Sequence, residues 1–66
     1  MIRTDKLRGR IVECGYSQKD VAKQIGIAPK TFYQKMQEGV FGSDEIQVMI
    51  DMLKIDNPVE IFFATE

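Results

Sequence analysis

The 66-residue sequence contains no histidine, no tryptophan and a single cysteine, Cys14. Without a second cysteine the chain cannot form an intrachain disulfide, and without histidine it has too few ligands for a zinc site. The lack of histidine also removes the usual general base for catalysis near neutral pH. Activation of Cys14 as a nucleophile would need a suitable neighbour, and its phase on the first predicted helix places it in the core. We therefore expect no enzyme, no metal site and no cofactor.

Long apolar runs are also absent, since no stretch approaches the roughly 20 apolar residues that a bilayer span requires. Residues 1–15 carry four cations and no continuous apolar segment, so we expect no signal peptide. Hydrophobic residues make up 44% of the chain and prolines number two, which favours a folded globule over a disordered tail. We expect one domain, residues 1–66, in a cytoplasmic protein that has no membrane partner.

The net charge of −1 conceals an uneven distribution of charge along the chain. Residues 1–35 contain eight cationic and three acidic side chains, a net charge of +5, whereas residues 36–66 contain one cation and seven acids, a net charge of −6. A cationic half is typical of a protein with one face toward a polyanion such as DNA. Small domains also divide charge unevenly by chance, so this pattern alone does not decide between the two interpretations.

The segment SQKDVAKQIGIAPKTFYQKMQEG, residues 17–39, predicts two short helices joined at a glycine. Ser17 followed by Asp20 resembles a capping box, which satisfies the free amides of a first helical turn. Gly26 can take the left-handed conformation that ends a helix, and Pro29 fits the first turn of the next one. Two helices joined by a short glycine-containing turn are typical of the DNA-binding helix-turn-helix unit.

Helical spacing accounts for the rest of the chain as well, and no segment alternates with the period of a strand. Helices are predicted over residues 4–14, 18–25 and 29–37, and a fourth runs from its cap residue Ser43 to about residue 54. A short final helix begins at Asn57 as the cap and Pro58 as the first helical residue. Phe41, in the loop before the fourth helix, is expected to anchor that loop to the core. The predicted fold class is all-α, with five helices.

Nearly the whole chain resembles the Cro/CI-type helix-turn-helix family of phage repressors, also called the XRE type, and especially its small single-domain phage branch. The most specific part of the likeness is the pattern Gln-x-x-x-Ala-x-x-x-Gly-Ile that starts at Gln18. The residues that carry it are LRGRI at 7–11, Ser17-Gln18, Ala22, Gly26-Ile27, Thr31-Phe32, Lys35-Met36, Phe41, Glu45-Ile46, Leu53 and Ile61-Phe62-Phe63. The resemblance implies a compact, lambda-repressor-like domain of five helices that binds operator DNA as a dimer.

The third predicted helix has two distinct faces. Phe32 and Met36 point the same way and are expected in the core, while the opposite face carries polar and cationic side chains. A lysine can donate to guanine, a glutamine can pair with adenine, and a threonine can offer its hydroxyl or its methyl group. The predicted base-reading residues are Pro29, Lys30, Thr31 and Gln34. The resemblance assigns base-facing positions to Pro29, Lys30 and Gln34, although Pro29 can supply only an apolar contact.

Phosphate contacts are expected from the cationic half of the chain. The predicted residues are Arg10, Ser17, Gln18, Lys19, Tyr33 and Lys35. For Gln18, the resemblance implies a contact with backbone phosphate that also braces the recognition helix. For each cation taken alone, a solvated surface charge is the competing interpretation.

The fourth predicted helix carries apolar residues on two sides. Val48 and Met52 lie nearly opposite its main apolar stripe, which a single core does not explain. One interpretation joins them to the end of the chain in an apolar dimer surface. The predicted dimer residues are Val48, Met52, Ile61, Phe62 and Phe63. In the alternative interpretation, the last helix folds over Val48 and Met52 and buries them within the monomer.

Two functions compete. The leading hypothesis is a sequence-specific transcription regulator that binds a palindromic operator in double-stranded DNA as a homodimer, through the third helix in the major groove and without a small-molecule ligand. The alternative is a protein-binding module, similar to an antirepressor or an antitoxin, in which the acidic half engages another regulator and DNA binding is weak or lost. Salt-dependent binding to duplex DNA distinguishes the two hypotheses.

Overall fold

In the computed structural model, which describes residues 2–63, the chain forms five α-helices and no strand within that range. The helices are α1 (Thr4–Glu13), α2 (Gln18–Ile25), α3 (Pro29–Glu38), α4 (Ser43–Leu53) and α5 (Pro58–Phe62). The all-helical prediction is confirmed, and every predicted helix end lies within one residue of the observed one. No helix in residues 2–63 combines the length and the apolar character needed to cross a bilayer.

All five helices contribute side chains to one hydrophobic core, because each has apolar residues at helical spacing on one side. The buried apolar residues are Leu7, Ile11, Val21, Ala22, Phe32, Met36, Phe41, Met49, Leu53, Ile55 and Phe62. Phe41 confirms the predicted loop anchor, since its ring centroid lies 5.5 Å from that of Phe32 in a tilted arrangement. Cys14 was expected in the core but is only half-buried, and its thiol donates to the Leu53 carbonyl at 3.4 Å.

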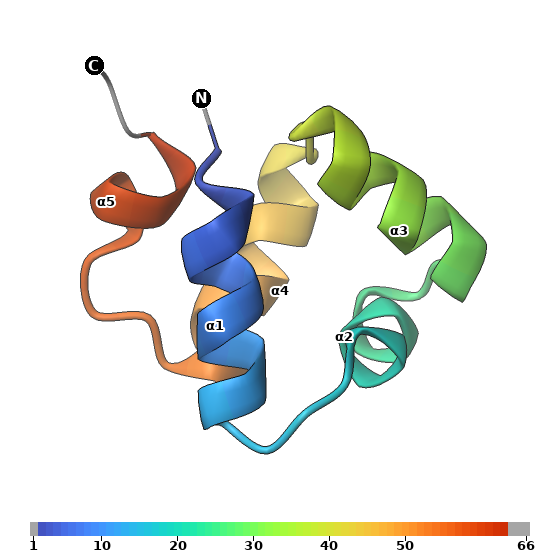
Figure 1. The fold of residues 1–66 in the computed structure, drawn as a ribbon, viewed down its shortest axis with the longest axis horizontal. Helices are drawn as coiled ribbons and strands as arrows, with labels where there is room; N and C mark the ends of the chain where they lie inside the picture. The colour runs from blue at the N-terminus through green and yellow to red at the C-terminus, as the bar shows by residue number, and fades with distance from the viewer. Residues whose placement is uncertain (1, 64–66) are drawn as a thin grey trace.

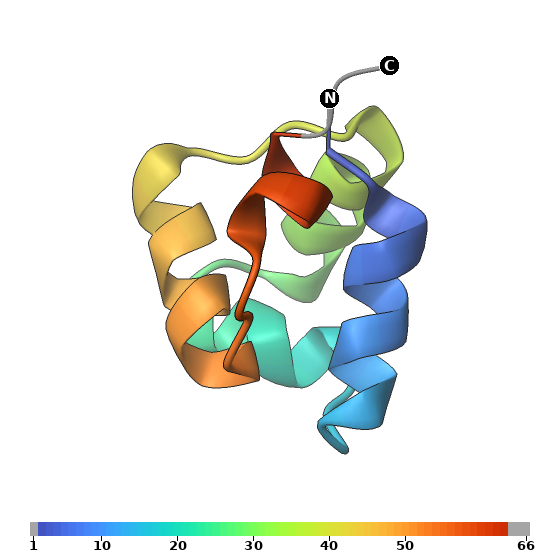
Figure 2. The ribbon, with the colours of Figure 1, turned by 90° about the vertical axis from the view of Figure 1, so that its left-hand side faces the viewer.

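The helices are arranged so that α2 and α3 lie at one side of the molecule and α5 at the other, with α1 and α4 between them (Figure 1). α2 packs against both α3 and α4. α5 packs beside α1, where the Arg3 amide donates to the Ile61 carbonyl at 2.7 Å. A view from the side places α5 in front of α1 and α4 (Figure 2). The α2–α3 pair is therefore presented on a side that α5 does not reach.

The start of α4 differs from the prediction. Gly42, not Ser43, is the cap residue, and Ser43 is the first residue of the helix. The Gly42 amide donates to the Glu45 carboxylate at 2.7 Å, which is the reciprocal bond of a capping box at the same three-residue spacing. At α5, Asn57 occupies the predicted cap position, but its side chain makes no capping hydrogen bond.

Candidate nucleic-acid interface

The start of α2 is fixed by the capping box that the sequence predicts. The Asp20 amide donates to the Ser17 hydroxyl at 3.2 Å, and the Ser17 amide donates to the Asp20 carboxylate at 2.8 Å. The hydrogen bond from the Ser17 amide, followed by that with the Ser17 side chain, holds the pKa of the Asp20 carboxyl below its ordinary value. An anionic Asp20 also suits the positive end of the helix. The first turn of α2 is thus stabilised by its own side chains.

Three residues, 26–28, connect α2 to α3. Gly26 has φ 94° and ψ 29°, the left-handed conformation that glycine adopts without steric cost, and its amide donates to the Ala22 carbonyl at 2.9 Å. Ala28 is extended, and Pro29 is the first residue of α3. An N–H at that position has no partner within the helix, so its absence in proline costs no hydrogen bond. This local chemistry turns the chain sharply, and α3 packs back on α2.

α3 has one buried and one exposed face, as its sequence predicts. Phe32 is fully buried and Met36 is 4% exposed, whereas Lys30, Thr31 and Gln34 are exposed. Gln37 continues the exposed face one turn further along the helix. No carboxylate occurs between Pro29 and Gln37, so the exposed face offers a cation, a hydroxyl and two amides to a ligand.

The remaining predicted base reader and the predicted neutral phosphate contacts lie on α3 or at the start of α2. Pro29 is half-buried, so only part of its surface is available for a contact. Tyr33 is 48% exposed on α3. Ser17 is exposed and Gln18 half-buried at the start of α2, and Lys19 beside them is exposed. The structure thus brings most of the predicted DNA contacts together on one pair of helices.

Ion pairs change the charge distribution that the sequence indicates. Four of the cations in the first half of the chain are paired with carboxylates: Arg3 with Asp5, Lys6 with Glu60, Arg10 with Glu13, and Lys35 with Glu45. The hydrogen bond from Arg3 lowers the pKa of the Asp5 carboxyl to about 2, and that from Lys6 holds the pKa of Glu60 below its ordinary value. Within residues 2–63, the cations that form no ion pair are Arg8, Lys19, Lys23, Lys30 and Lys54. Three of these five belong to α2 and α3.

Arg10 is bonded to the end of α4. Its Nε donates to the Leu53 carbonyl at 2.8 Å, one Nη donates to the Lys54 carbonyl at 3.2 Å, and the other pairs with Glu13 at 3.1 Å. A cation at a helix C-terminus satisfies carbonyls that have no intrahelical partner. Arg10 therefore joins α1 to α4, and its phosphate contact stays a prediction.

Lys35 is likewise engaged within the protein. Its Nζ lies 2.9 Å from a carboxylate oxygen of Glu45, and the Lys35 side chain is about one-third exposed. Glu45, one of the residues that carry the family resemblance, is a buried charged residue whose burial and pairing were not predicted. The missed signal was the three-residue spacing from Gly42 to Glu45, because Ser43 offered a more familiar cap one residue later.

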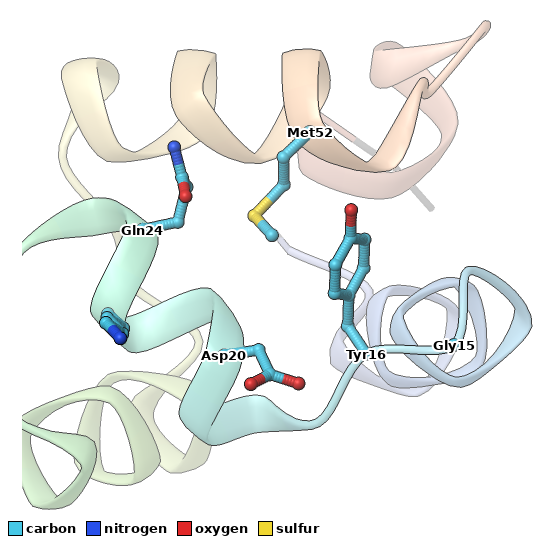
Figure 3. A pocket seen from close by; sticks show the side chains of 6 residues that line it. Gly15, Tyr16, Asp20, Gln24 and Met52 are labelled. Atoms are coloured by element: carbon cyan, nitrogen blue, oxygen red, sulfur yellow. The ribbon is translucent and has the colours of Figure 1, made fainter.

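The predicted dimer residues do not form one continuous surface. Phe62 is 3% exposed and belongs to the core, so its assignment to a dimer contact is corrected, while Phe63 is 57% exposed and Ile61 half-buried. Val48 and Met52 are also half-buried, and no residue of α5 lines the hollow beside Met52. Met52 points into a hollow of about 820 Å³ between α4 and α2, facing Tyr16 and Gln24 (Figure 3).

On the opposite side of α4, Phe63 and Pro58 line a separate hollow of about 480 Å³ together with Ile46 and Ile50. The end of the chain therefore meets a different face of α4 from the one that carries Met52. The physical reason is the helical period, since residues 46 and 50 lie on nearly the opposite side of α4 from residues 48 and 52.

Comparison with known proteins adds no identification, since no protein-family model, no curated protein and no solved structure matches this chain.

Proposed function

We propose that the protein is a sequence-specific DNA-binding transcription regulator in which α2 and α3 act as a helix-turn-helix and α3 enters the major groove of an operator. One observation carries this proposal: the exposed face of α3 holds Lys30, Thr31 and Gln34 and no carboxylate, while Phe32 and Met36 fix the opposite face in the core. The likeness of the sequence to the Cro/CI-type family points to the same function.

The chemistry of this face suits base edges. An α-helix fits the major groove, and in helix-turn-helix proteins the N-terminal residues of the second helix contact the bases. Lys30 and Gln34 are one helical turn apart, at the second and sixth of the ten residues of α3, and both side chains are long enough to reach a base edge. Lysine donates to guanine O6 and N7, and glutamine pairs with adenine N6 and N7. Lys30 therefore favours guanine and Gln34 favours adenine.

Homodimerisation on DNA is part of the proposal. The protomer measures 30 × 22 × 19 Å, which is small enough for two copies to bind half-sites about 34 Å apart on one side of the duplex. A palindromic operator would then present the same bases to α3 of each copy. The predicted apolar residues that are exposed or half-buried remain the candidates for contacts between the two copies, and these are Val48, Met52, Ile61 and Phe63.

Selection from random duplex DNA tests the proposal. The expected result is a motif of two inverted half-sites one helical turn apart. Gln34→Ala should then remove the preference at one position of each half-site, worth about 1–3 kcal/mol of discrimination, and leave non-specific affinity nearly unchanged. Gln47→Ala is the matched control, because Gln47 is an exposed glutamine of α4 whose side chain bonds Asp51 on the same helix.

Enrichment of no sequence by the wild-type protein would refute the proposal, and salt-independent DNA binding would favour the protein-binding alternative. Retention of every base preference by Gln34→Ala would instead show that α3 does not read DNA through this face.

A further inference from the structure

We infer that Lys35 and Glu45 form a positioning contact that fixes the orientation of α3 on α4 and so determines how accurately α3 meets base edges. The inference rests on the proposed DNA-binding function and deepens it, since it assigns Lys35 a role inside the protein in place of a phosphate contact. The pair lies behind the exposed face of α3 and joins residues ten positions apart in the sequence.

The contact is built around one buried carboxylate oxygen. Glu45 is 8% exposed, and its Oε1 accepts from Lys35 Nζ at 2.9 Å and from the Gly42 amide at 2.7 Å. These three groups come from α3, from the loop before α4 and from the first turn of α4. A carboxylate that accepts two hydrogen bonds, one of them from a cation, constrains both distance and direction.

Few other contacts of α3 restrict both the distance and the direction between α3 and α4. α3 packs chiefly on α2, and its contact with the loop before α4 includes the apolar ring pair Phe32–Phe41. Phe32 and Met36 resist rotation of α3 about its own axis because they are buried in the core, but apolar contacts are non-directional and restrict small rotations less than a directional hydrogen bond does. The Lys35–Glu45 pair, which is bonded at fixed geometry, opposes that rotation.

The effect of rotation on base reading is large. Lys35 directly follows Gln34, so any rotation that displaces the ammonium group displaces the amide as well. A rotation of about 20° moves a side chain at the helix surface by roughly 2 Å, given a helix radius of about 6 Å with side chains. That displacement exceeds the distance range over which a hydrogen bond to a base is kept. Loss of the pair should therefore weaken recognition of sequence more than binding to DNA in general.

Four variants test the inference: Lys35→Met, Glu45→Gln, the double variant of both, and Lys35→Arg. Affinity is measured over a range of salt for the duplex enriched by selection and for a scrambled duplex of equal length, and unfolding is measured in urea without DNA. Each single variant should lower the ratio of enriched to scrambled affinity by roughly tenfold, equivalent to the loss of one base contact. The double variant should lower it no further, because both changes remove the same contact. Lys35→Arg should retain the wild-type ratio.

Salt dependence separates this role from a phosphate contact. A positioning role predicts that Lys35→Met leaves the salt slope and the affinity for scrambled DNA within about twofold of wild type. A phosphate contact predicts that the slope falls by about 0.9 for each protomer and that both duplexes weaken equally, which would overturn the inference. An unchanged ratio in both single variants would also overturn it. If Glu45→Gln fails to fold, Lys35→Met carries the test, because the Lys35 side chain is only partly buried.

A separate outcome concerns the proposed function itself. If the wild-type protein enriches no duplex at all, the proposed function fails and the positioning role falls with it. The urea measurements would still reveal whether the two side chains are coupled in stability. If the wild-type protein selects DNA and the variants select it equally well, only the positioning role is wrong.

Discussion

At the scale of single residues, Gly26 and Gly9 both have free space around them but perform different roles. Gly26 ends α2 with φ 94°, and a Cβ built on it would meet no atom within 4 Å. Gly9 lies in the middle of α1, is exposed, and would likewise meet no atom within 4 Å. Neither position is therefore restricted by space, and only the backbone conformation distinguishes them.

Alanine substitution should consequently have opposite effects at these two glycines. Gly9→Ala is expected to stabilise the protein by about 0.5–1 kcal/mol, because glycine in a helix interior loses more backbone entropy on folding. Gly26→Ala is expected to destabilise it by about 1–2 kcal/mol, because alanine is strained in the left-handed region. Urea denaturation of the two variants measures both changes. Stabilisation by Gly26→Ala would mean that α2 does not end in this conformation.

Sequence periodicity predicted the faces of α3, but not the partners of Lys35 on that helix or of Arg10 on α1. Burial of Phe32 and exposure of Gln34 follow from a period of 3.6 residues, which is a local property. Arg10 and Lys35 bond to groups 43 and 10 residues away, and such partners depend on how helices pack. Their partners within the protein were for that reason beyond the reach of the sequence.

At the scale of helices, the capping residues were predictable where one choice was clearly best. Ser17 and Asp20 are each suited to their positions, and the structure contains both of their reciprocal bonds. Before α4, Gly42 and Ser43 are adjacent and both are acceptable caps. Glu45 decides between them by accepting from the Gly42 amide, and its pairing with Lys35 supports that choice. The start of α4 is therefore set by a local bond that the adjacent Ser43 made hard to recognise in the sequence, and it is supported by a tertiary contact that local sequence rules do not include.

Capping of α2 predicts an acid-side dependence of stability. The pKa of the Asp20 carboxyl is lowered in the folded protein, so its contribution to stability is present above its unfolded value of about 3.8 and is lost as pH falls through the folded value. Asp20→Asn should be less stable than wild type at pH 7, and the difference should shrink as pH falls below about 4. Thermal unfolding followed by circular dichroism over this pH range measures it. A difference that stays constant down to pH 2 would contradict the role assigned to the Asp20 carboxylate.

At the scale of the whole molecule, two of the eight cations in residues 1–35 are paired with carboxylates from the acidic half of the chain. Lys6 pairs with Glu60 across α1 and α5, and Lys35 pairs with Glu45 across α3 and α4. Charges that seemed available for DNA in the sequence instead hold helices together. The cationic surface left for a polyanion is narrower than the charge of +5 in residues 1–35 indicates, and Lys19, Lys23 and Lys30 are its members on α2 and α3.

The salt dependence of DNA binding should reflect this smaller number of available cations. If each copy of a bound dimer neutralises phosphates with Lys19, Lys23 and Lys30, log affinity should fall with log salt with a slope of about −5. If Arg10 and Lys35 contact phosphates as well, the slope should steepen to about −9. Lys19→Gln should reduce the slope by about 2 for the dimer, because one phosphate contact is lost in each copy.

Lys54→Gln is the matched control for this measurement. Lys54 is exposed after α4, and within residues 2–63 it forms no ion pair, so its removal changes the net charge by the same amount at a distance from α3. The salt slope of the Lys54→Gln variant should equal that of the wild-type protein. Equal slopes for Lys19→Gln and wild type would remove Lys19 from the interface. A wild-type slope near −9 would instead mean that Arg10 and Lys35 exchange their partners in the protein for phosphates, which would cost the protein the contacts that join α4 to α1 and α3.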